Sequence, residues 1–417
     1  MSTSFYTRNN KRIVIEDKPL ATGGEGTVHK VVSPFYSGHC VKMYHDKSKM
    51  GDKQRKIEFM IANPPVDLKG VNYNIVCWPK EIIFSKNKEF VGFIMPLAFP
   101  NSKELYELCS LNNKLPSAWQ QKYDRRTGRG LIARMKLCTN LAASVHRVHS
   151  LRKYVFADMK PQNILVTNDS KVSLVDLDSI QISENKKILF PASVATGEYE
   201  PPESKIIKSR SNLALEESWD RFSMAIIFYE ILFGIHPYAA SFSGHYQSCH
   251  ETSESIQNNL FVHGANKKYV RRLPPLHENY HKIPTSLQEL FTRAFDRNPV
   301  QRPTAEEFGE VFYTIVIEAE KKTSNHSSFS STRNTPKYAK VKCRILACIV
   351  DVVVFVLFIN LVKYVLQGMN AFSPSVLEIM TILIYFYYTV YTLRSSPKLT
   401  PHYAKLHAPI GRVKFNP

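Results

Sequence analysis

The chain has 417 residues, of which 44% are hydrophobic and 22% charged, so it can bury a sizeable core and is not a disordered protein. Its formal charge of +19 points to a nucleic acid, an anionic membrane surface or a phosphate-rich ligand as a partner. There is no helix-turn-helix, zinc-finger or RNA-recognition signature, which leaves nucleic acid as the weakest of these partners. Seven scattered cysteines without a C-x-x-C pair predict neither a disulfide framework nor a zinc site, and they fit a reducing cytosol.

The first residues, 1–12, form a predicted N-terminal extension that is mostly polar. They lack the apolar core of a secretory signal, so we expect the bulk of the chain to stay in the cytoplasm. Two strand-like runs follow, and a glycine-rich turn at Gly23, Gly24 and Gly26 separates them. Glycines let the backbone approach phosphate groups without obstruction by side chains, but glycine-rich hairpins without a ligand are common too. The turn alone leaves a phosphate site and a plain hairpin as alternatives.

A lysine lies in the next apolar strand, where its ammonium costs free energy unless it has a partner. This residue is Lys42, in the run 40–44. The partner that we predict is Glu58, which lies in a short segment of helical character that the Pro64-Pro65 pair ends, and Glu81 is the alternative. Further strands are predicted over residues 74–78, 81–84 and 90–97.

Residues 103–152 carry apolar side chains at three- and four-residue spacing, which predicts supporting helices. A short polar loop then places Asp158, Lys160 and Asn163 between apolar runs, and a later apolar run leads into Asp176. A phosphotransferase needs this spacing, because a carboxylate must receive a hydroxyl proton, an ammonium must neutralise a phosphate, and an amide oxygen must hold a metal. A polar hairpin loop with accidental spacing is the alternative, and the segments downstream decide between the two.

Four later segments occur in order, and with the loop they resemble the protein kinase family. The segments are Thr196-Gly197-Glu198-Tyr199-Glu200-Pro201-Pro202-Glu203, Trp219-Asp220-Arg221-Phe222-Ser223-Met224-Ala225, Phe233-Gly234-Ile235-His236-Pro237-Tyr238, and Asp296-Arg297-Asn298-Pro299-Val300-Gln301-Arg302-Pro303-Thr304. The resemblance implies an α+β fold over residues 13–318, with a small β-rich lobe and a large helical lobe. It also implies that Asp220 braces the catalytic loop and that Arg302 pairs with Glu203.

The resemblance further assigns roles around ATP. Asp158 is the implied base, Lys160 contacts the transferred phosphoryl group, and Asn163 and Asp176 hold Mg²⁺, with Mn²⁺ as an alternative ion. The residues implied in catalysis are Asp158, Lys160, Lys42, Glu58 and Thr196. Those implied in binding ATP are Leu20, Ala21, Gly23, Gly24, Gly26, Val28, Lys42, Met95, Leu97, Ala98, Asn163 and Leu165. Met95 would lie behind the adenine, and the backbone from Pro96 to Ala98 would follow the purine edge.

Three positions depart from the family pattern. Phe156 and Ala157 stand where the family has His-Arg, so the arginine that binds an activation-loop phosphate is missing, and we do not expect switching by loop phosphorylation. The triplet Asp176-Leu177-Asp178 replaces D-F-G, which either holds one backbone state or places a second carboxylate near the metal. Gly197 replaces a proline. None of these changes removes a proton acceptor, a metal ligand or a phosphate-binding cation, so an active enzyme is favoured.

The expected substrates are serine and threonine hydroxyls of proteins, because Lys160 together with Thr196 resembles the Ser/Thr-specific pattern of the family. The surroundings of Asp158 and Asp176 resemble bacterial members of the family. Two alternatives stay open. One is a membrane-tethered pseudokinase scaffold that binds nucleotide without turnover. The other is a small-molecule phosphotransferase of the same fold, a class that generally lacks the segments 196–203 and 296–304.

The last quarter of the chain predicts a linker, a membrane hairpin and a basic tail. Residues 319–343 are rich in Ser, Thr, Asn and Lys and cannot pack a core. Two apolar runs, 345–362 and 376–393, predict a pair of transmembrane helices within residues 344–394. Residues 395–417 then form the tail.

Lysine and arginine residues flank both predicted spans, whereas only Lys363 lies between them, so both flanks are expected on the cytoplasmic side of the cell (inner) membrane. Anionic lipid headgroups would then account for part of the positive charge. Residues 344–351 also resemble the opening of RDD-type membrane domains. We also expect a homo-oligomer that forms through the membrane helices. A further hypothesis is that the two membrane helices form a conduit for small solutes, which would require such an oligomer.

Overall fold

The computed structural model describes residues 4–48, 50–65, 74–111, 114–192, 196–210 and 213–329, with the backbone alone for 323–329. The chain divides into two compact units, and within the described residues the first comprises everything up to Ala319. The second unit begins at Glu320. The predicted membrane spans (344–394) and basic tail (395–417) lie outside the described residues, as does most of the predicted linker. Within the described part, no helix combines the length and apolar character needed to cross a bilayer.

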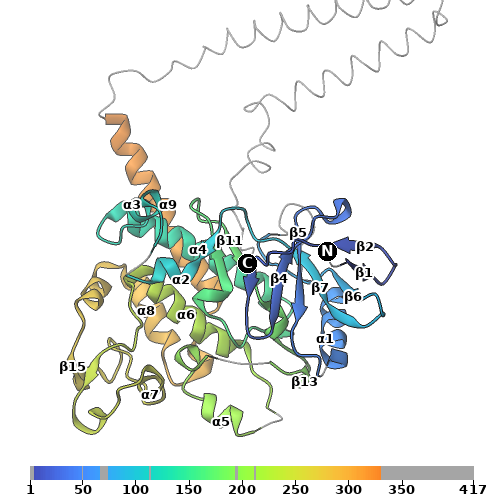
Figure 1. Ribbon diagram of the computed structural model, residues 1–417. Helices are drawn as coiled ribbons and strands as arrows, with labels where there is room; N and C mark the ends of the chain where they lie inside the picture. Colours follow the sequence, from blue (N-terminus) through green and yellow to red (C-terminus); the bar gives the residue numbers. More distant parts are fainter. Residues whose placement is uncertain are drawn as a thin grey trace, which may run out of the picture. The chain divides into compact units, whose positions relative to one another are not determined.

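An antiparallel sheet of seven strands forms the N-terminal lobe of the first unit (Figure 1). Its strand order is β2-β1-β6-β7-β5-β4-β3. The register between β4 and β5 sets Val28 opposite Lys42, and that between β5 and β7 sets Lys42 opposite Phe93. The strands are β1 (Ser4–Thr7), β2 (Arg12–Val14), β3 (Ala21–Thr22), β4 (Gly26–Lys30), β5 (His39–Tyr44), β6 (Glu81–Phe84) and β7 (Phe90–Pro96).

Two segments of this lobe differ from the sequence-based expectation. Strand β1 lies inside the sheet, between β2 and β6, and buries Phe5 against Ile13 and Ile83. The predicted extension therefore belongs to the lobe, and the domain boundary at residue 13 moves to include β1. The predicted strand over residues 74–78 is reduced to a single bridge, in which Val76 lies beside Leu174 of the C-terminal lobe.

Helix α1 (Met50–Ala62) packs against β6 and β7 and ends just before the proline pair, as predicted. Its buried side chains are Lys56, Ile57 and Met60. Residues three and four positions apart share one face of a helix, so Ile57 and Met60 fix which side of α1 faces the sheet. This choice also turns Lys56 inward.

Helix α6 is the centre of the C-terminal lobe, and apolar side chains bury it on nearly all sides. Helix α4 packs against it, and α4 buries an apolar stripe that includes Leu137, Leu141 and Val145. The helices are α2 (Leu105–Cys109), α3 (Ser117–Lys122), α4 (Gly128–His149), α5 (Ser204–Lys208), α6 (Glu217–Phe233), α7 (Thr252–Gln257), α8 (Thr285–Ala294) and α9 (Ala305–Phe329). The short strands are β8 (Lys103–Glu104), β9 (Tyr154–Val155), β10 (Ile164–Val166), β11 (Val172–Leu174), β12 (Gln181–Glu184), β13 (Lys187–Phe190), β14 (Ser241–Phe242) and β15 (Val270–Arg272).

Candidate active site

A polar loop between β9 and β10 carries the first group of candidate residues. Lys160 Nζ lies 2.6 Å from one carboxylate oxygen of Asp158, and the Thr196 hydroxyl donates a hydrogen bond of 2.6 Å to the other. The Lys160 ammonium also donates to the Thr196 hydroxyl at 3.2 Å. Thr196 comes from the later segment before the 3-10 turn Gly197–Tyr199, so tertiary structure brings it to the loop. We call Asp158, Lys160, Asn163 and Thr196 the lower cluster.

Asn163 and Asp176, the predicted metal ligands, line one cavity of about 20 Å³ together with Asp158. Asn163 donates its side-chain N–H to the Asp158 carbonyl at 3.0 Å, which aims the amide but leaves its oxygen available. Asp176 follows β11 and adopts a left-handed backbone conformation, with φ of 59°. Its side chain is 43% exposed. One carboxylate and one amide oxygen, with water and phosphate oxygens completing the shell, suit Mg²⁺.

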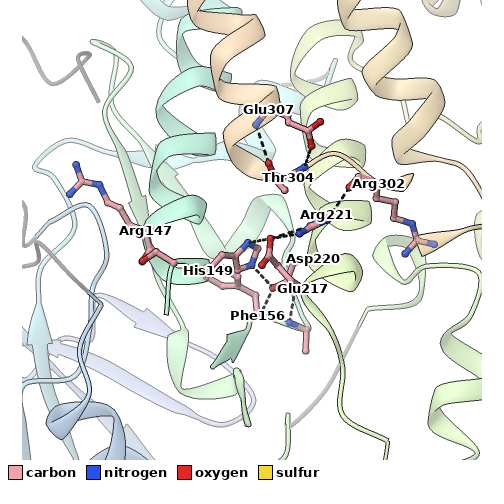
Figure 2. Close-up of polar contacts among 11 residues, drawn as sticks. Arg147, His149, Phe156, Glu217, Asp220, Arg221, Arg302, Thr304 and Glu307 are labelled. Atoms are coloured by element: carbon pink, nitrogen blue, oxygen red, sulfur yellow. Dashed lines mark hydrogen bonds and ion pairs between the residues drawn. The ribbon is translucent and has the colours of Figure 1, made fainter. Parts of the chain in front are cut away.

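Asp220, near the start of α6, holds the catalytic loop through hydrogen bonds, as predicted (Figure 2). Its carboxylate accepts the backbone N–H groups of Phe156 at 2.7 Å and Ala157 at 3.0 Å. His149 Nε2, at the end of α4, lies 2.9 Å from the same carboxylate. Ala157 has a φ of 63°, a strained conformation for a residue with a side chain, and these bonds stabilise it. Asp220 is fully buried, so its charge depends on these donors.

A second network in Figure 2 ties α6 to the segment before α9. Arg221 donates to Glu217 at 3.0 and 2.9 Å and to the Arg302 carbonyl at 3.1 Å. Arg302 is 1% exposed and donates two hydrogen bonds, of 2.7 and 2.8 Å, to the two carboxylate oxygens of Glu203. The predicted pairing of Arg302 with Glu203 is therefore confirmed.

Lys42 lies on β5, and its ammonium contacts Asp176 from the N-terminal lobe. Its Nζ lies 2.5 Å from Asp176 Oδ1, 2.6 Å from Asp178 Oδ1 and 3.9 Å from Glu25 Oε2. Burial acts to lower the pKa of Lys42, but the charges of Asp178 and Asp176 outweigh it and hold that pKa above its ordinary value. The lysine therefore stays charged beside the lower cluster.

The predicted partner of Lys42 was wrong. Glu58 lies on the outer side of α1 and pairs with Arg8. Glu81, the alternative, accepts a hydrogen bond from the Tyr36 hydroxyl. The Glu58 assignment fails because Ile57 and Met60 decide the inward face of α1, which turns Glu58, the residue after Ile57, outward.

Asp178, for which the sequence analysis left a place near the metal open as one of two alternatives, pairs with Lys42. Its second carboxylate oxygen accepts a hydrogen bond of 2.8 Å from the Tyr44 hydroxyl, and its side chain is 3% exposed. Burial acts to raise the pKa of Asp178, but the Lys42 charge and the hydrogen bonds from Lys42 and Tyr44 hold it below its ordinary value. Lys56 is close enough to contribute to the same lowering. We call Lys42, Tyr44, Lys56 and Asp178 the Lys42 wall.

The glycine-rich turn separates into two kinds of glycine. A methyl group on Gly26 would lie 2.1 Å from the Met43 carbonyl oxygen, so packing within the sheet requires glycine there. A methyl group on Gly24 would meet nothing within 4 Å, and one on Gly23 only the Gly26 oxygen at 4.0 Å. Protein packing therefore explains Gly26 but not the other two, whose open edge leaves room for phosphates.

The predicted adenine edge follows β7. Met95 is buried, and Val28, Leu97 and Ala98 pack against the hydrophobic cluster that contains it. The N–H of Leu97 is taken by the Gly38 carbonyl at 3.0 Å. In the described part of the chain, the N–H of Ala98 has no protein acceptor, which makes it the donor left for a purine. Two predicted residues lie outside that cluster: Leu20 is 52% exposed, and Leu165 is half-buried on β10.

The arrangement can position a phosphate chain between two groups of charge. The lower cluster offers a carboxylate for a proton and an ammonium for a transferred group, and the Lys42 wall offers a second ammonium. Asp176 lies between them. The sequence analysis foresaw the lower cluster in full but missed Tyr44, Lys56 and His149. For Lys56 the apolar pair Ile57 and Met60, which decides the inward face of α1, was an available signal.

The family described as protein kinase domain matches residues 85–313, more than half of the chain. Over 297 residues the chain is 27% identical to the protein kinase YegI of Escherichia coli K12, covering 69% of this chain and 42% of that protein. It is 25% identical over 200 residues to the dual specificity protein kinase shkC of Dictyostelium discoideum, covering 47% of this chain and 35% of that protein. The chain thus spans less than half the length of these curated relatives.

Among solved structures, the fold resembles the ROP18 kinase domain in complex with AMP-PNP and sucrose. The TM-score is 0.51, with 78% of this chain and 87% of that chain covered. At 14% sequence identity, the likeness concerns the fold alone. It supports the two-lobed arrangement of sheet and helices.

Proposed function

This chain belongs to the protein kinase family, and we propose that it transfers the γ-phosphate of ATP to serine and threonine hydroxyls of proteins. The observation that supports this most is the mutual contact of Asp158, Lys160 and Thr196 beside Asn163 and Asp176. Phosphoryl transfer needs positioning and neutralisation of charge more than covalent chemistry, and these side chains supply both.

Each residue has a role in this proposal. The Asp158 carboxylate accepts the proton of the substrate hydroxyl, and Thr196 and Lys160 fix its orientation until the substrate enters. Lys160 then neutralises charge on the transferred group, while Lys42 contacts the phosphates from the opposite side. Asn163 and Asp176 would hold Mg²⁺, or Mn²⁺ in its place. The bound metal and ATP supply charge neutralisation and the transferable group.

The test uses the purified full chain with ATP labelled at the γ-phosphate, Mg²⁺ and a mixture of peptides that carry Ser, Thr or Tyr. We expect labelling of Ser and Thr, and a loss of about 10²- to 10⁴-fold in Asp158→Asn, because the proton acceptor is removed. Asp176→Asn should lose comparable activity through the metal. Asp169→Asn is the matched control, since Asp169 is 61% exposed in the turn between β10 and β11.

Equal labelling by the wild-type chain and Asp158→Asn would contradict the proposal. Nucleotide binding without labelling would favour the pseudokinase scaffold. Labelling of a small molecule but of no peptide would favour the small-molecule phosphotransferase.

We also propose that residues 344–394 anchor the kinase domain at the inner face of the cell membrane. The two apolar runs and the basic residues on their outer flanks support this. The test is fractionation of cells that express the full chain or a form ending at residue 343. The full chain should resist extraction by salt and carbonate, whereas the shortened form should be soluble; equal distribution of the two forms would refute the anchor.

A further inference from the structure

We propose that Asp178 is the carboxylate that positions Lys42 for the nucleotide, a task that helix α1 does not perform in this chain. The proposal rests on the proposed phosphoryl transfer and adds a positioning residue to the same site. It goes beyond the sequence pattern, which assigns the partner of Lys42 to α1.

The geometry separates Asp178 from its neighbour Asp176. Both carboxylates contact Lys42, but the Asp176 side chain is 43% exposed and that of Asp178 only 3%. Asp176 can therefore turn toward a metal in the cleft. Asp178 cannot, because Lys42 and the Tyr44 hydroxyl occupy one carboxylate oxygen each. When Asp176 leaves Lys42, Asp178 at 2.6 Å is the carboxylate that stays hydrogen-bonded to it, whereas Glu25 lies farther away, at 3.9 Å.

Backbone structure fixes Asp178 in this place. It sits in the 3-10 turn Leu177–Ser179, where the Ser179 hydroxyl donates a hydrogen bond of 2.9 Å to the Asp176 carbonyl. Leu177 on one side and Ile180 on the other are buried in the hydrophobic core. A buried side chain on a packed turn has little freedom, and a positioning group requires that rigidity.

Helix α1 brings a positive charge to this site, and not the carboxylate that the sequence pattern assigns to it. Lys56 is buried on its inner face and donates a hydrogen bond of 3.3 Å to the Pro191 carbonyl. Two residues along, Glu58 faces outward, because positions two apart on a helix point to nearly opposite sides. A second buried ammonium close to Lys42 is tolerable only where a carboxylate compensates both, and the Asp178 charge acts on Lys42 and on Lys56.

The test exchanges the charges between the two elements. Four variants of the full chain are compared with the wild type: Asp178→Asn, Glu58→Gln, Lys56→Glu combined with Asp178→Asn, and Asp169→Asn as an exposed control. The first readout is kcat/KM for ATP with a peptide substrate. The second is the urea midpoint of unfolding without nucleotide or metal, which requires no turnover.

We expect Asp178→Asn to lower kcat/KM by about tenfold or more, because an unpaired buried ammonium is held in no single orientation. Glu58→Gln and the control should stay within about twofold of the wild type. The double variant places a carboxylate on the inner face of α1, so it should recover both kcat/KM and the urea midpoint relative to Asp178→Asn.

Three results would overturn the proposal. The first is full kcat/KM in Asp178→Asn. The second is a loss in Glu58→Gln as large as that in Asp178→Asn, which would mean that α1 turns to supply the carboxylate. The third is recovery of the urea midpoint without recovery of kcat/KM in the double variant, which is the signature of a purely structural role.

Two further measurements allow the result to be interpreted if a variant does not fold or the chain is inactive. If Asp178→Asn fails to fold, Tyr44→Phe removes only the hydrogen bond that orients Asp178, and it should lower kcat/KM in the same direction by a smaller factor. If the wild-type chain transfers no phosphate, the proposed function fails by itself, while the urea midpoints still report whether Asp178 is the partner of Lys42.

Discussion

The lower cluster and the Lys42 wall both lie next to Asp176, which shares a small cavity with Asp158 and Asn163 and an ion pair with Lys42, but they are assembled in opposite ways. The lower cluster takes three of its four residues from the single stretch 158–163, and only Thr196 comes from elsewhere. The Lys42 wall takes its residues from β5, α1 and the turn that follows Asp176. Spacing along the chain determines the geometry of the first group, whereas the second depends on which face each element turns inward.

The two regions also differ in exposure. In the lower cluster the side chains of Lys160 and Asp158 are 26% and 9% exposed, whereas those of Lys42 and Asp178 in the Lys42 wall are 6% and 3% exposed. A partly exposed charge can change partners at small cost, but a buried charge needs a permanent one. The comparison teaches that charges of the lower cluster can change partners when substrate binds, whereas charges of the Lys42 wall keep the same partners.

The largest expected effect on stability comes from Asp220, which holds the loop that carries the lower cluster. Asp220→Asn replaces one acceptor oxygen with an amide group that opposes an N–H donor of the loop. We expect the free energy of unfolding to fall by roughly 3–5 kcal/mol, because the loss leaves a buried donor unpaired. Urea denaturation measures it, with exposed Asp17→Asn as the control. A change no larger than that of the control would show that the loop does not depend on this carboxylate.

A smaller loss is expected in the sheet beside the Lys42 wall. Gly26→Ala places a methyl group 2.1 Å from the Met43 carbonyl oxygen, so the strands must shift. The expected cost is about 1–3 kcal/mol, typical of overpacking. Gly24→Ala, where nothing lies within 4 Å, is the matched control and should unfold at the wild-type urea concentration. Equal midpoints for the two variants would indicate that the sheet adjusts to the added methyl group, and would weaken the claim that the Lys42 wall keeps a fixed geometry.

The charge of Lys56 gives a pH-dependent prediction. Burial lowers the pKa of Lys56 to about 8 from an ordinary value of 10.5. Between these values the unfolded chain binds more protons, so wild-type stability rises as the pH increases from about 8 to about 10.5. Lys56→Met should be more stable at pH 7, by roughly 1–3 kcal/mol, and should lack this rise.

The measurement for Lys56→Met is a series of urea titrations from pH 7 to pH 10. The gain of the variant should shrink toward the alkaline end. Parallel stability curves for the two proteins would mean that the buried ammonium carries no penalty.

The smallest effect is expected on the outer face of α1. Arg8→Gln breaks the ion pair with Glu58, whose partners are 64% and 33% exposed. Surface ion pairs contribute little, so the urea midpoint and kcat/KM for ATP should both match the wild type within error. A clear loss of activity would place Glu58 closer to the site than the structure does.

The sequence predicted those parts of the fold and site that depend on local pattern. The two lobes, the end of α1 before Pro64, the brace by Asp220 and the pair of Arg302 with Glu203 all follow motif and spacing. The partner of Lys42 did not follow from motif and spacing, because these leave open which flank of α1 faces the sheet. The apolar pair Ile57 and Met60 was the available signal.

Strand β1 has a practical consequence for any shortened form of the protein. A version that begins at residue 13 would lack the strand that pairs with β6 through Tyr6 and Phe84. It would also lose Phe5, which packs beside Ile13 and Ile83. The bared edge of β6 would offer open N–H and C=O groups to strands of other molecules, so truncation at that point favours aggregation over soluble monomers.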